Sequence, residues 1–533
     1  LRGRLDPNTG ASLRRTTMNP LVQALLDPSA YDHPVAAVEL IETHISWIFL
    51  TGRFAYKLKK PVNLGFVDFS TPELRRRCCE EEVRLNRRLA ANLYLGLRDL
   101  HGPPERAHLG GEGPVIEAVV QMRQFQQRDL LPEALRRGAV SAEQIDALAD
   151  DLALFHANAA QASPTDPWGS PERVLDPAVA NLETLAQLGR SPPDGEAMAC
   201  WTRDELTRLQ PLLEARREQG RIRECHGDLH LGNMALHEER ILVFDCLEFS
   251  PRLRWIDPIS DLAFLVMDLQ ERSHGDLALR LLNRWLESGG DHGGLPLLPW
   301  YVAYRALVRA KVTALRLQQP DLAPSAVEPL EAELGNYLNR ARLAMARPRC
   351  ALLITHGISG SGKSHAARQL RGWGWIQLRS DVERLRLDGR WGCGSAKGPS
   401  RSGQDDRNPY DPAVTERLYG EVLLEAAEAS LAGGLCVVVD ATFLKKTQRQ
   451  AFIDLARRRG AGFGILNCSV PLNLALERLE QRRSQENDVS EADAGVVMAQ
   501  MAALEPLNAE EQSLVIDAKD SRLRLNPGGL PIP

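Results

Sequence analysis

The segment 351–370, ALLITHGISGSGKSHAARQL, restricts the fold of this chain more than any other stretch. An apolar run at 351–354 predicts a buried strand, and 364–370 predicts a helix. Between them, glycines let consecutive backbone N–H groups point inward, and the start of the helix adds its positive dipole end. The strand, the loop and the helix all fit a phosphate-binding loop. A glycine-rich turn without that function would not need all three in this order. The predicted phosphate-binding residues are Gly357, Ser359, Gly360, Ser361, Gly362, Lys363, which would reach the β/γ-phosphates, and Ser364, which would also bind Mg2+.

Length and composition set the broad limits. At 533 residues the chain predicts about three units, taking about 150 residues per domain. A hydrophobic content of 44% and a charged content of 25%, with no apolar run near 18 residues, predict a soluble globular protein without a membrane span. The net charge of −5 gives no overall attraction to nucleic acid. Nine scattered cysteines without a C-x-x-C pattern indicate reduced thiols and a cytoplasmic protein.

The domain organisation follows from changes in pattern along the chain. We expect a disordered extension at 1–17, a first module at 18–345, and a second module at 346–533. The first module divides into a strand-rich small lobe, 18–125, and a helical lobe, 126–345. Because the join at Arg347-Pro348-Arg349 is short, we expect the modules to pack against each other. The sequence leaves the oligomeric state open.

The small lobe contains a candidate lysine and its partner. Two strands meeting at Thr51-Gly52-Arg53 predict a hairpin, and its second strand carries Lys57 within Phe54-Ala55-Tyr56-Lys57. This resembles the strand of protein kinases whose lysine holds phosphate, although an exposed strand lysine is commonly only a solvated charge. In the helix predicted at 71–91, Glu82 lies on the same apolar stripe as Leu85 and Leu89. Glu82 is therefore our choice over Glu80 and Glu81 as the partner of Lys57.

The helical lobe carries the residues for phosphoryl transfer. His226-Gly-Asp228 is followed by Asn233, and Asp245 ends an apolar strand. Transfer to a hydroxyl needs a carboxylate to orient it and accept its proton, and oxygen ligands for Mg2+. Asp228 fits the first requirement, and Asn233 and Asp245 fit the second. The alternative is that His226 and Asp228 only support a loop.

The motif H-G-D-L-H-L-G-N, followed by F-D and by Asp261-Leu-Ala, resembles the aminoglycoside and choline phosphotransferases over about 40–345. The resemblance implies a bilobal kinase-like fold in which Lys57 holds phosphate, Glu82 pairs with it, and Asp228 is the base. It also implies that Asn233 and Asp245 bind metal, and that His226 and Asp261 support the loop. The sequence departs from this pattern because no G-x-G-x-x-G precedes Lys57. Asp245 is followed by Cys-Leu-Glu, so Glu248 is either a third acid near the metals or a helix cap.

The second module alternates strands and helices, which predicts a parallel α/β sheet. The predicted strands include 375–378, 435–439, 464–468 and 513–517. Asp381 follows the first of these strands, and we expect it to activate the acceptor hydroxyl, with a helix cap as the alternative. Arg384 would hold a charged substrate and Asp440 would position Mg2+. Arg478 and Arg482, one helical turn apart, form a candidate lid over the phosphoryl group, or else a solvated face.

This half resembles the P-loop kinases that include gluconate kinase, zeta toxin and polynucleotide kinase, the closest match being R-S-D-V-E-R at 379–384. The order of the two halves resembles bacterial two-domain proteins with an aminoglycoside phosphotransferase half and an AAA-family half. The Gly- and Ser-rich insertion at 388–408 is expected to be a mobile loop over the acceptor site.

Together these features predict an α/β and α+β protein with two ATP·Mg2+ sites. Each would transfer the γ-phosphoryl of ATP to a hydroxyl of a small molecule, and nucleic acid is disfavoured as the acceptor. In the alternatives, one module is a non-catalytic nucleotide sensor or scaffold, or the second is a polynucleotide-kinase-like or zeta-toxin-like kinase.

Overall fold

The structure of the protein is a computed structural model, which describes residues 19–65, 67–320, 322–393, 411–484, 493–517, 520, 524, 526 and 529–533. The expected extension at 1–17 and most of the insertion at 388–408 lie outside these residues. The chain divides into two compact units. The first comprises Leu1–Ser141, Ala160–Ala162 and Ile222–Ile256, and the second comprises Ala142–Ala159, Ser163–Arg221 and Asp257–Pro533. Most helices of the predicted helical lobe thus share a unit with the P-loop segment.

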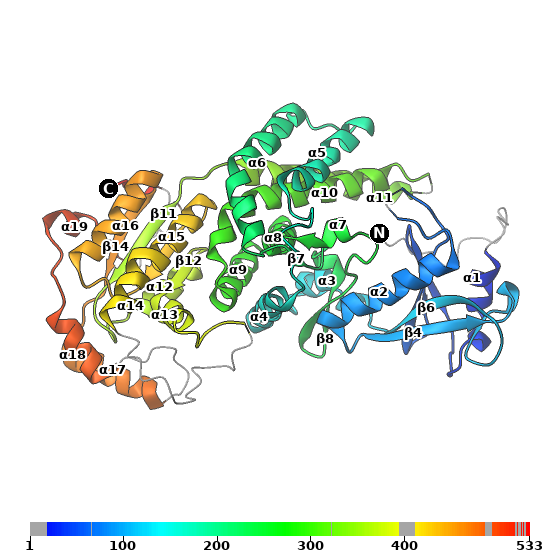
Figure 1. The fold of residues 1–533 in the computed structure, drawn as a ribbon, viewed down its shortest axis with the longest axis horizontal. Helices are drawn as coiled ribbons and strands as arrows, with labels where there is room; N and C mark the ends of the chain where they lie inside the picture. The colour runs from blue at the N-terminus through cyan, green and yellow to red at the C-terminus, as the bar shows by residue number, and fades with distance from the viewer. Residues whose placement is uncertain are drawn as a thin grey trace. The chain divides into compact units, whose positions relative to one another are not determined.

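The first unit is built on an antiparallel sheet of six strands in the order β1-β2-β3-β6-β4-β5. Residues 51–53 join β2 to β3 in an antiparallel hairpin, as the sequence predicts. The helix α2 packs on β6 and β4 (Figure 1). The strands are β1 (Glu39–Glu42), β2 (Ser46–Leu50), β3 (Phe54–Lys59), β4 (Tyr94–His101), β5 (His108–Leu109) and β6 (Val115–Arg123), and α1 spans Pro20–Leu25.

The helix α2 (Pro72–Ala90) begins where the sequence indicates a helix start. The Thr71 side chain accepts a hydrogen bond from the N–H of Leu74, and Pro72 occupies the first turn, where its missing N–H costs nothing. The face of α2 that meets the sheet buries Cys79, Glu82 and several apolar residues. A carboxylate is therefore carried into the interior of this unit.

Two short antiparallel pairs complete the first unit. The hairpin of β8 (Met234–His237) and β9 (Arg240–Val243) follows the motif H-G-D-L-H-L-G-N at 226–233, called below the catalytic-loop motif after the role that its resemblance implies. The other pair joins β7 (Arg223–Glu224) to β10 (Trp255–Ile256). The short helix α3 (Leu131–Arg136) precedes these pairs in sequence, and the short helix α7 (Pro251–Arg254) lies between β9 and β10.

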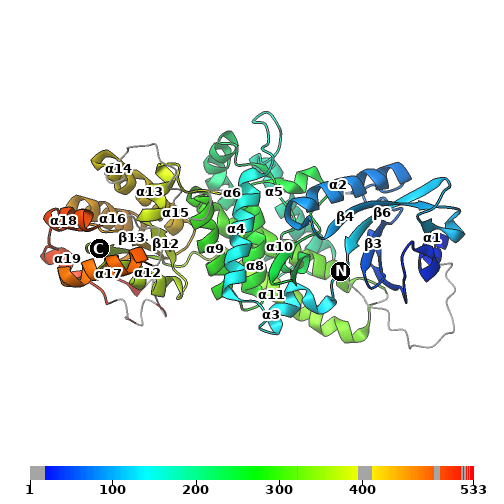
Figure 2. The same ribbon diagram turned by 90° about the horizontal axis from the view of Figure 1, so that it is seen from below.

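The second unit contains a bundle of long helices. Its central helix α10 packs on α8 and α11, and α4 packs on α9 (Figure 2). Buried apolar residues cover most of α8 and α10, including Phe264 and Trp300. The helices are α4 (Ala142–Asn158), α5 (Pro171–Gln187), α6 (Gly195–Glu218), α8 (Pro258–Glu271), α9 (Gly275–Gly289), α10 (Leu298–Leu317) and α11 (Pro324–Met345).

The same unit contains a parallel sheet in the order β12-β13-β11-β14. Its strands are β11 (Ala351–His356), β12 (Ile376–Arg379), β13 (Val437–Asp440) and β14 (Gly462–Asn467). All six residues of β11 are buried, as expected for a central strand. The accompanying helices are α12 (Lys363–Arg371), α13 (Ser380–Leu387), α14 (Pro412–Arg417), α15 (Leu423–Ala432), α16 (Lys446–Arg459), α17 (Leu472–Ser484), α18 (Ala494–Ala502) and α19 (Ala509–Ser513).

One predicted strand, 513–517, is wrong. The helix α19 ends at Ser513, and only one isolated bridge joins Val515 to Ile465. The backbone around Val515 still pairs with β14: the N–H of Ile465 donates to the carbonyl of Leu514, and the N–H of Ile516 donates to the carbonyl of Ile465, both at 2.9 Å. None of the described helices is long and apolar enough to cross a membrane.

Candidate functional sites in the two units

The first site centres on Lys57 of β3. Its ammonium donates to Glu82 Oε1 of α2 at 2.7 Å and to Asp245 Oδ1 at 2.5 Å. The structure thus brings together a strand lysine, a helix glutamate and the aspartate expected to bind metal. Glu82 is fully buried, as its place on the apolar stripe of α2 predicts. Burial works against the charged forms, yet Lys57 and Lys59 together keep the pKa of Glu82 below its ordinary value.

Lys59 and Glu248 extend this group, and the sequence analysis gave Lys59 no role. Lys59 lies on the same face of β3 as Lys57, and its ammonium is 2.5 Å from Glu82 Oε2 and also bonded to Glu248. Glu248 is therefore an acid within this network and not a helix cap, because Ser250 is the cap residue of α7. Burial is the main reason that the pKa of Glu248 is raised. The sequence did contain a signal for Lys59: residues two apart on a strand share one face, so Lys59 lies on the same side of the sheet as Lys57.

Asp245 is held in an unusual backbone conformation. Its φ is +65°, a region that costs a residue with a side chain about 1–3 kcal/mol unless its surroundings fix it. Its N–H donates to the hydroxyl of Tyr94 at 3.2 Å, and its carboxylate contacts Lys57. Burial opposes ionisation, but Lys57 lowers the pKa of Asp245 to about 2. The carboxylate is therefore charged at neutral pH.

The catalytic-loop motif is organised by its histidine and asparagine. The ring of His226 accepts the N–H of Asp228 on Nδ1 at 3.2 Å, and its Nε2 donates to the carbonyl of Phe244 at 3.0 Å. The amide of Asn233 donates to the Asp228 carbonyl and to Asp228 Oδ2, both at 3.0 Å. His226 thus joins the loop to the end of β9, and Asn233 orients the Asp228 side chain.

A pocket opens beside Lys57 and Asp245. Its walls come from the hairpin of β2 and β3, the end of β6 and the segment after β9, and they are largely apolar. An apolar wall next to a buried ammonium suits a nucleotide, whose base is largely apolar on its faces and whose phosphates are anionic. The lining residues are Ile41, Ile48, Leu50, Ala55, Lys57, Leu93, Tyr94, Met122, Arg123, Gln124, Phe125, Gln127, Phe244 and Asp245.

The donor set of this site fits Mg2+. Asn233 uses its amide nitrogen on Asp228, so its oxygen is the atom of that side chain suited to a cation. Asp245 supplies an ionised carboxylate. Oxygen ligands of this kind are those that Mg2+ prefers, with water and phosphate oxygens completing its coordination.

The second site is the phosphate cradle between β11 and α12. A Cβ on Gly357 would lie 2.2 Å from the carbonyl oxygen of Cys468, and one on Gly360 would lie 2.5 Å from that of Ala475, so both positions require glycine. Lys363 Nζ donates across the loop to the carbonyl of Ile358 at 2.8 Å. Ser361 Oγ is buried without a hydrogen-bond partner among the described residues. An unsatisfied hydroxyl inside a glycine-lined loop fits a phosphate-binding cradle.

Helix α18 contributes a contact that the sequence did not indicate. The N–H of Ser359, which is expected to face a phosphate, donates to Gln500 Oε1 at 2.7 Å. The amide oxygen of Gln500 thus satisfies one donor of the cradle.

Asp440 ends β13 beside the first residues of α12. Its Oδ1 accepts from the Ser364 hydroxyl at 3.2 Å, and its Oδ2 accepts from Gln377 Nε2 at 3.0 Å. Burial raises the pKa of Asp440, and the nearby Asp381 adds to this effect. A hydroxyl and a carboxylate in contact at the mouth of a phosphate loop fit Mg2+. The sequence gives no signal for the contact of Gln377 with Asp440, because the two residues lie on different strands.

The acceptor candidates lie at the end of β12. Asp381 is in the first turn of α13, whose cap residue is Arg379, so Asp381 is not the helix cap. Arg384 is buried in α13, and its guanidinium donates to the Thr415 hydroxyl at 3.1 Å. Arg478 lies over the cradle, 3.4 Å from the carbonyl of Gly360. Arg482 belongs to α17, but its side chain lies outside the description.

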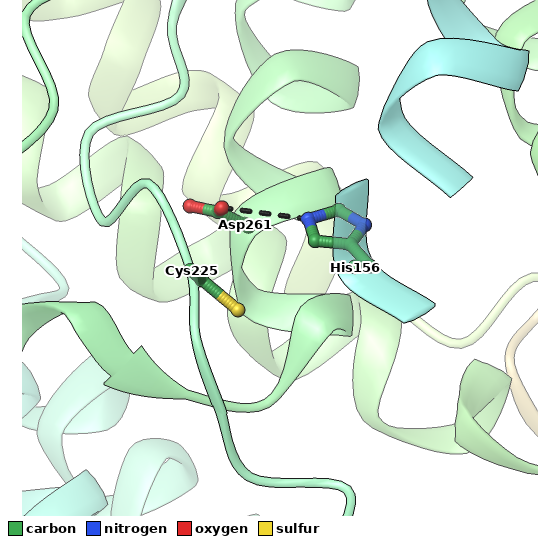
Figure 3. Close-up of side chains that lie close together, drawn as sticks. All are labelled: His156, Cys225 and Asp261. Carbon is green, nitrogen blue, oxygen red and sulfur yellow. Dashed lines mark hydrogen bonds and ion pairs between the residues drawn. The ribbon is translucent and has the colours of Figure 1, made fainter. Parts of the chain in front are cut away.

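Asp261, expected to support the catalytic loop, is completely buried in the first turn of α8. Trp285 donates to Nδ1 of His156, which leaves Nε2 to face Asp261 Oδ2 at 3.5 Å (Figure 3). This chain of contacts links α4, α8 and α9 within the second unit.

Comparisons with known proteins match one family to each half of the chain. Residues 72–298 match the phosphotransferase enzyme family, and residues 352–507 match the AAA domain family. Uncharacterized protein Rv2004c of Mycobacterium tuberculosis (strain ATCC 25618 / H37Rv) is 32% identical over 480 residues, which cover 88% of this chain and 92% of the relative. Uncharacterized protein Mb2027c of Mycobacterium bovis (strain ATCC BAA-935 / AF2122/97) gives the same values.

Solved structures similar to this chain include a choline/ethanolamine kinase family protein from Mesorhizobium loti, with 13% identity and a TM-score of 0.38 over 62% of this chain and 94% of that one. Amicoumacin kinase hAmiN, solved with AMP-PNP, Ca2+ and Ami, has 14% identity and a TM-score of 0.35 over 60% of this chain and 91% of that one.

The two family matches and the two sites define a kinase-like phosphotransferase half followed by a P-loop domain of the AAA type. The chain belongs to the bacterial two-domain family that the mycobacterial relatives represent. The family matches support phosphotransfer as its general activity.

Proposed function

We propose that the protein is an ATP-dependent phosphotransferase with two sites, each transferring the γ-phosphoryl group of ATP to a hydroxyl of a small molecule. The observation that carries the proposal is Lys57, whose ammonium contacts both Glu82 and Asp245. Protein kinases need such a lysine–glutamate pair and the metal-binding aspartate together in one site.

In the first site, Lys57 holds the phosphates and Asp228 orients the acceptor hydroxyl and accepts its proton. Asn233 and Asp245 would hold Mg2+, which neutralises charge on the phosphates when bound. The hydrogen bonds from Asn233 to Asp228 keep the base next to the metal ligands.

In the second site, Lys363 and the loop N–H groups bind the phosphates, and Ser364 and Asp440 would hold Mg2+. Asp381 is the base for the acceptor hydroxyl, Arg384 holds a charged part of the substrate, and Arg478 covers the transferring group. Arg482 is proposed as a second cover on the same helix.

The test uses the full chain with γ-labelled ATP and a cell metabolite extract. Asp228→Asn silences the first site, Lys363→Ala silences the second, and the double variant silences both. We expect labelled products in the wild type. Each single variant should lose a different subset of these products, and the double variant should form no labelled product. Lys446→Ala, which changes an exposed lysine, is the matched control for Lys363→Ala. Labelling that persists in the double variant would contradict the proposal.

The same labelled products separate the alternatives. Loss of all products through only one of the two substitutions would make the other site a nucleotide sensor. Efficient, salt-sensitive labelling of 5′-hydroxyl oligonucleotides through the Lys363 site would make it polynucleotide-kinase-like.

A further inference from the structure

Helix α9 covers the exposed edge of the parallel sheet. Among the described residues β12 is the last strand on this side of the sheet, and the Asn283 side chain forms two hydrogen bonds with the backbone of 375–377. Asn283 Nδ2 donates to the carbonyl of Trp375 at 3.0 Å, and Asn283 Oδ1 accepts the N–H of Gln377 at 2.8 Å. One amide side chain therefore supplies the donor and the acceptor that a neighbouring strand would offer.

One turn further along α9, Glu287 contacts the end of the same strand. Its Oε1 accepts from the Arg379 guanidinium at 2.9 Å, and its Oε2 is 3.5 Å from Arg371 of α12. The backbone carbonyl of Glu287 accepts from Arg386 and from the Trp391 indole, both at 2.8 Å. The Glu287 side chain is only 11% exposed, so these charge-assisted bonds are shielded from water.

Arg379 connects this helix with the P-loop site. It is the last residue of β12, and in the parallel pairing with β13 it lies opposite Asp440. Asp381 follows it by two residues in the first turn of α13. The guanidinium that Glu287 holds is therefore at the strand ends where the metal-binding and acceptor carboxylates lie.

From this arrangement we propose that Glu287 is a positioning residue for the P-loop site, acting through Arg379, so that the helices of the phosphotransferase half set the geometry of phosphoryl transfer in the other half. The proposal rests on the function proposed above for Asp440 and Asp381. Glu287 itself touches neither nucleotide nor acceptor.

The physical reason is competition for one cation. With Glu287 present, the Arg379 guanidinium is oriented toward α9. Without that carboxylate, the acids that still act on the Arg379 guanidinium include Asp381 and Asp440, and an arginine–carboxylate pair formed there would occupy oxygens needed for Mg2+ and the acceptor. Small displacements of reacting groups can reduce a rate by up to 100-fold, so we expect a loss of about 10-fold or more.

The experiment measures ATP turnover by the full chain carrying Asp228→Asn, which silences the first site. The remaining turnover belongs to the P-loop site, and its loss in Lys363→Ala confirms this. Glu287→Gln is expected to lower kcat by about 10-fold with little change in the KM for ATP, because the cradle is intact. Glu287→Asp should recover part of the rate. In an Arg379→Gln background, Glu287→Gln should cause no further loss, because its effect passes through Arg379.

The matched control is Asp150→Asn, which removes a carboxylate bound to Arg284 and Ser288 of the same helix α9. We expect it to keep the parent kcat. An unchanged kcat in Glu287→Gln, or losses that add in the double variant, would overturn the inference.

A second readout does not depend on turnover. Hydrogen exchange in peptides covering 376–387 of the full chain should accelerate in Glu287→Gln and not in Asp150→Asn. A parent protein without Lys363-dependent turnover would contradict the proposed function, and the exchange experiment would still decide the role of Glu287. Equal exchange in all three proteins would overturn that role.

Discussion

Ser364 Oγ donates a hydrogen bond to Asp440 Oδ1 at 3.2 Å, although the two residues are 76 positions apart. The contact exists because β11 and β13 are neighbours in a parallel sheet, so the loop after one strand meets the end of the other. In the proposed function, this contact marks where Mg2+ and the phosphates would be held.

Removal of the buried charge of Glu82 should destabilise the first unit. Glu82→Gln leaves Lys57 and Lys59 buried with less compensating charge, and loss of one partner from a buried ion pair costs about 3–5 kcal/mol. Glu80→Gln is the matched control, because Glu80 lies two positions away on α2 with its side chain 58% exposed. Scanning calorimetry should show a clearly lower Tm for the first variant only. Equal melting of the two variants would refute the assigned network.

Asp228→Asn should reduce transfer at the first site by about 10²–10⁴-fold while ATP still binds. The amide cannot accept the proton of the acceptor hydroxyl, but Lys57 still faces the phosphates. Initial rates and ATP titrations in a Lys363→Ala background measure the two effects separately. Glu238→Gln, in the turn between β8 and β9, is the control and should leave both unchanged. Near-wild-type transfer by Asp228→Asn would reject Asp228 as the base.

Gly357→Ala should impair nucleotide binding at the second site. The added methyl group would meet the carbonyl of Cys468 at 2.2 Å, and the φ of Gly357 is +138°, so the loop has to move. In contrast, Gly392→Ala adds a methyl group that meets nothing within 4 Å. With Lys57→Ala present in both proteins, isothermal titration with ATP should show weakened binding only for Gly357→Ala. The same affinity in both proteins would show that the loop tolerates the side chain.

The cysteines of α2 should react slowly with iodoacetamide. Burial raises the pKa of Cys79 to about 12 and that of Cys78 to about 11, so the reactive thiolate is scarce at pH 8. Cys200 is exposed and should be labelled first. Below its raised pKa, the thiolate fraction of each α2 cysteine grows about tenfold per pH unit, and its labelling should rise accordingly. Peptide mass spectrometry follows each site, with urea-unfolded protein as the control. Cys79 labelled as fast as Cys200 would contradict its burial.

Local sequence patterns predicted much of both sites. The 3.6-residue period of α2 selected Glu82 among three consecutive glutamates, and the glycine spacing located the cradle. Residues that act through long-range contacts were not predictable in this way. Apart from the face it occupies, Lys59 cannot be distinguished in the sequence from an ordinary strand lysine, because its partner Glu248 is far away along the chain. The role of Gln377 likewise depends on its hydrogen bond to Asp440 on the neighbouring strand.

The incorrect strand at 513–517 has a different cause. Its apolar residues suggested a strand, and they do lie against β14, but α19 continues to Ser513 and Leu514 is its cap residue. Pairing with β14 is therefore limited to a single bridge between Val515 and Ile465. The contacts of Asn283 and Glu287 with β12 had no comparable sequence signal, because nothing local links positions about 90 apart.

The two bonds from Asn283 to β12 also bear on how the protein is made. During synthesis the chain emerges from its amino-terminal end, so α9 is complete before β12 leaves the ribosome. An uncovered strand edge can pair with another chain and begin aggregation. In this protein α9 is synthesised before β12, so the edge strand can pack on a helix that has already left the ribosome. Gene truncations that begin after α11 would release the sheet without this cover.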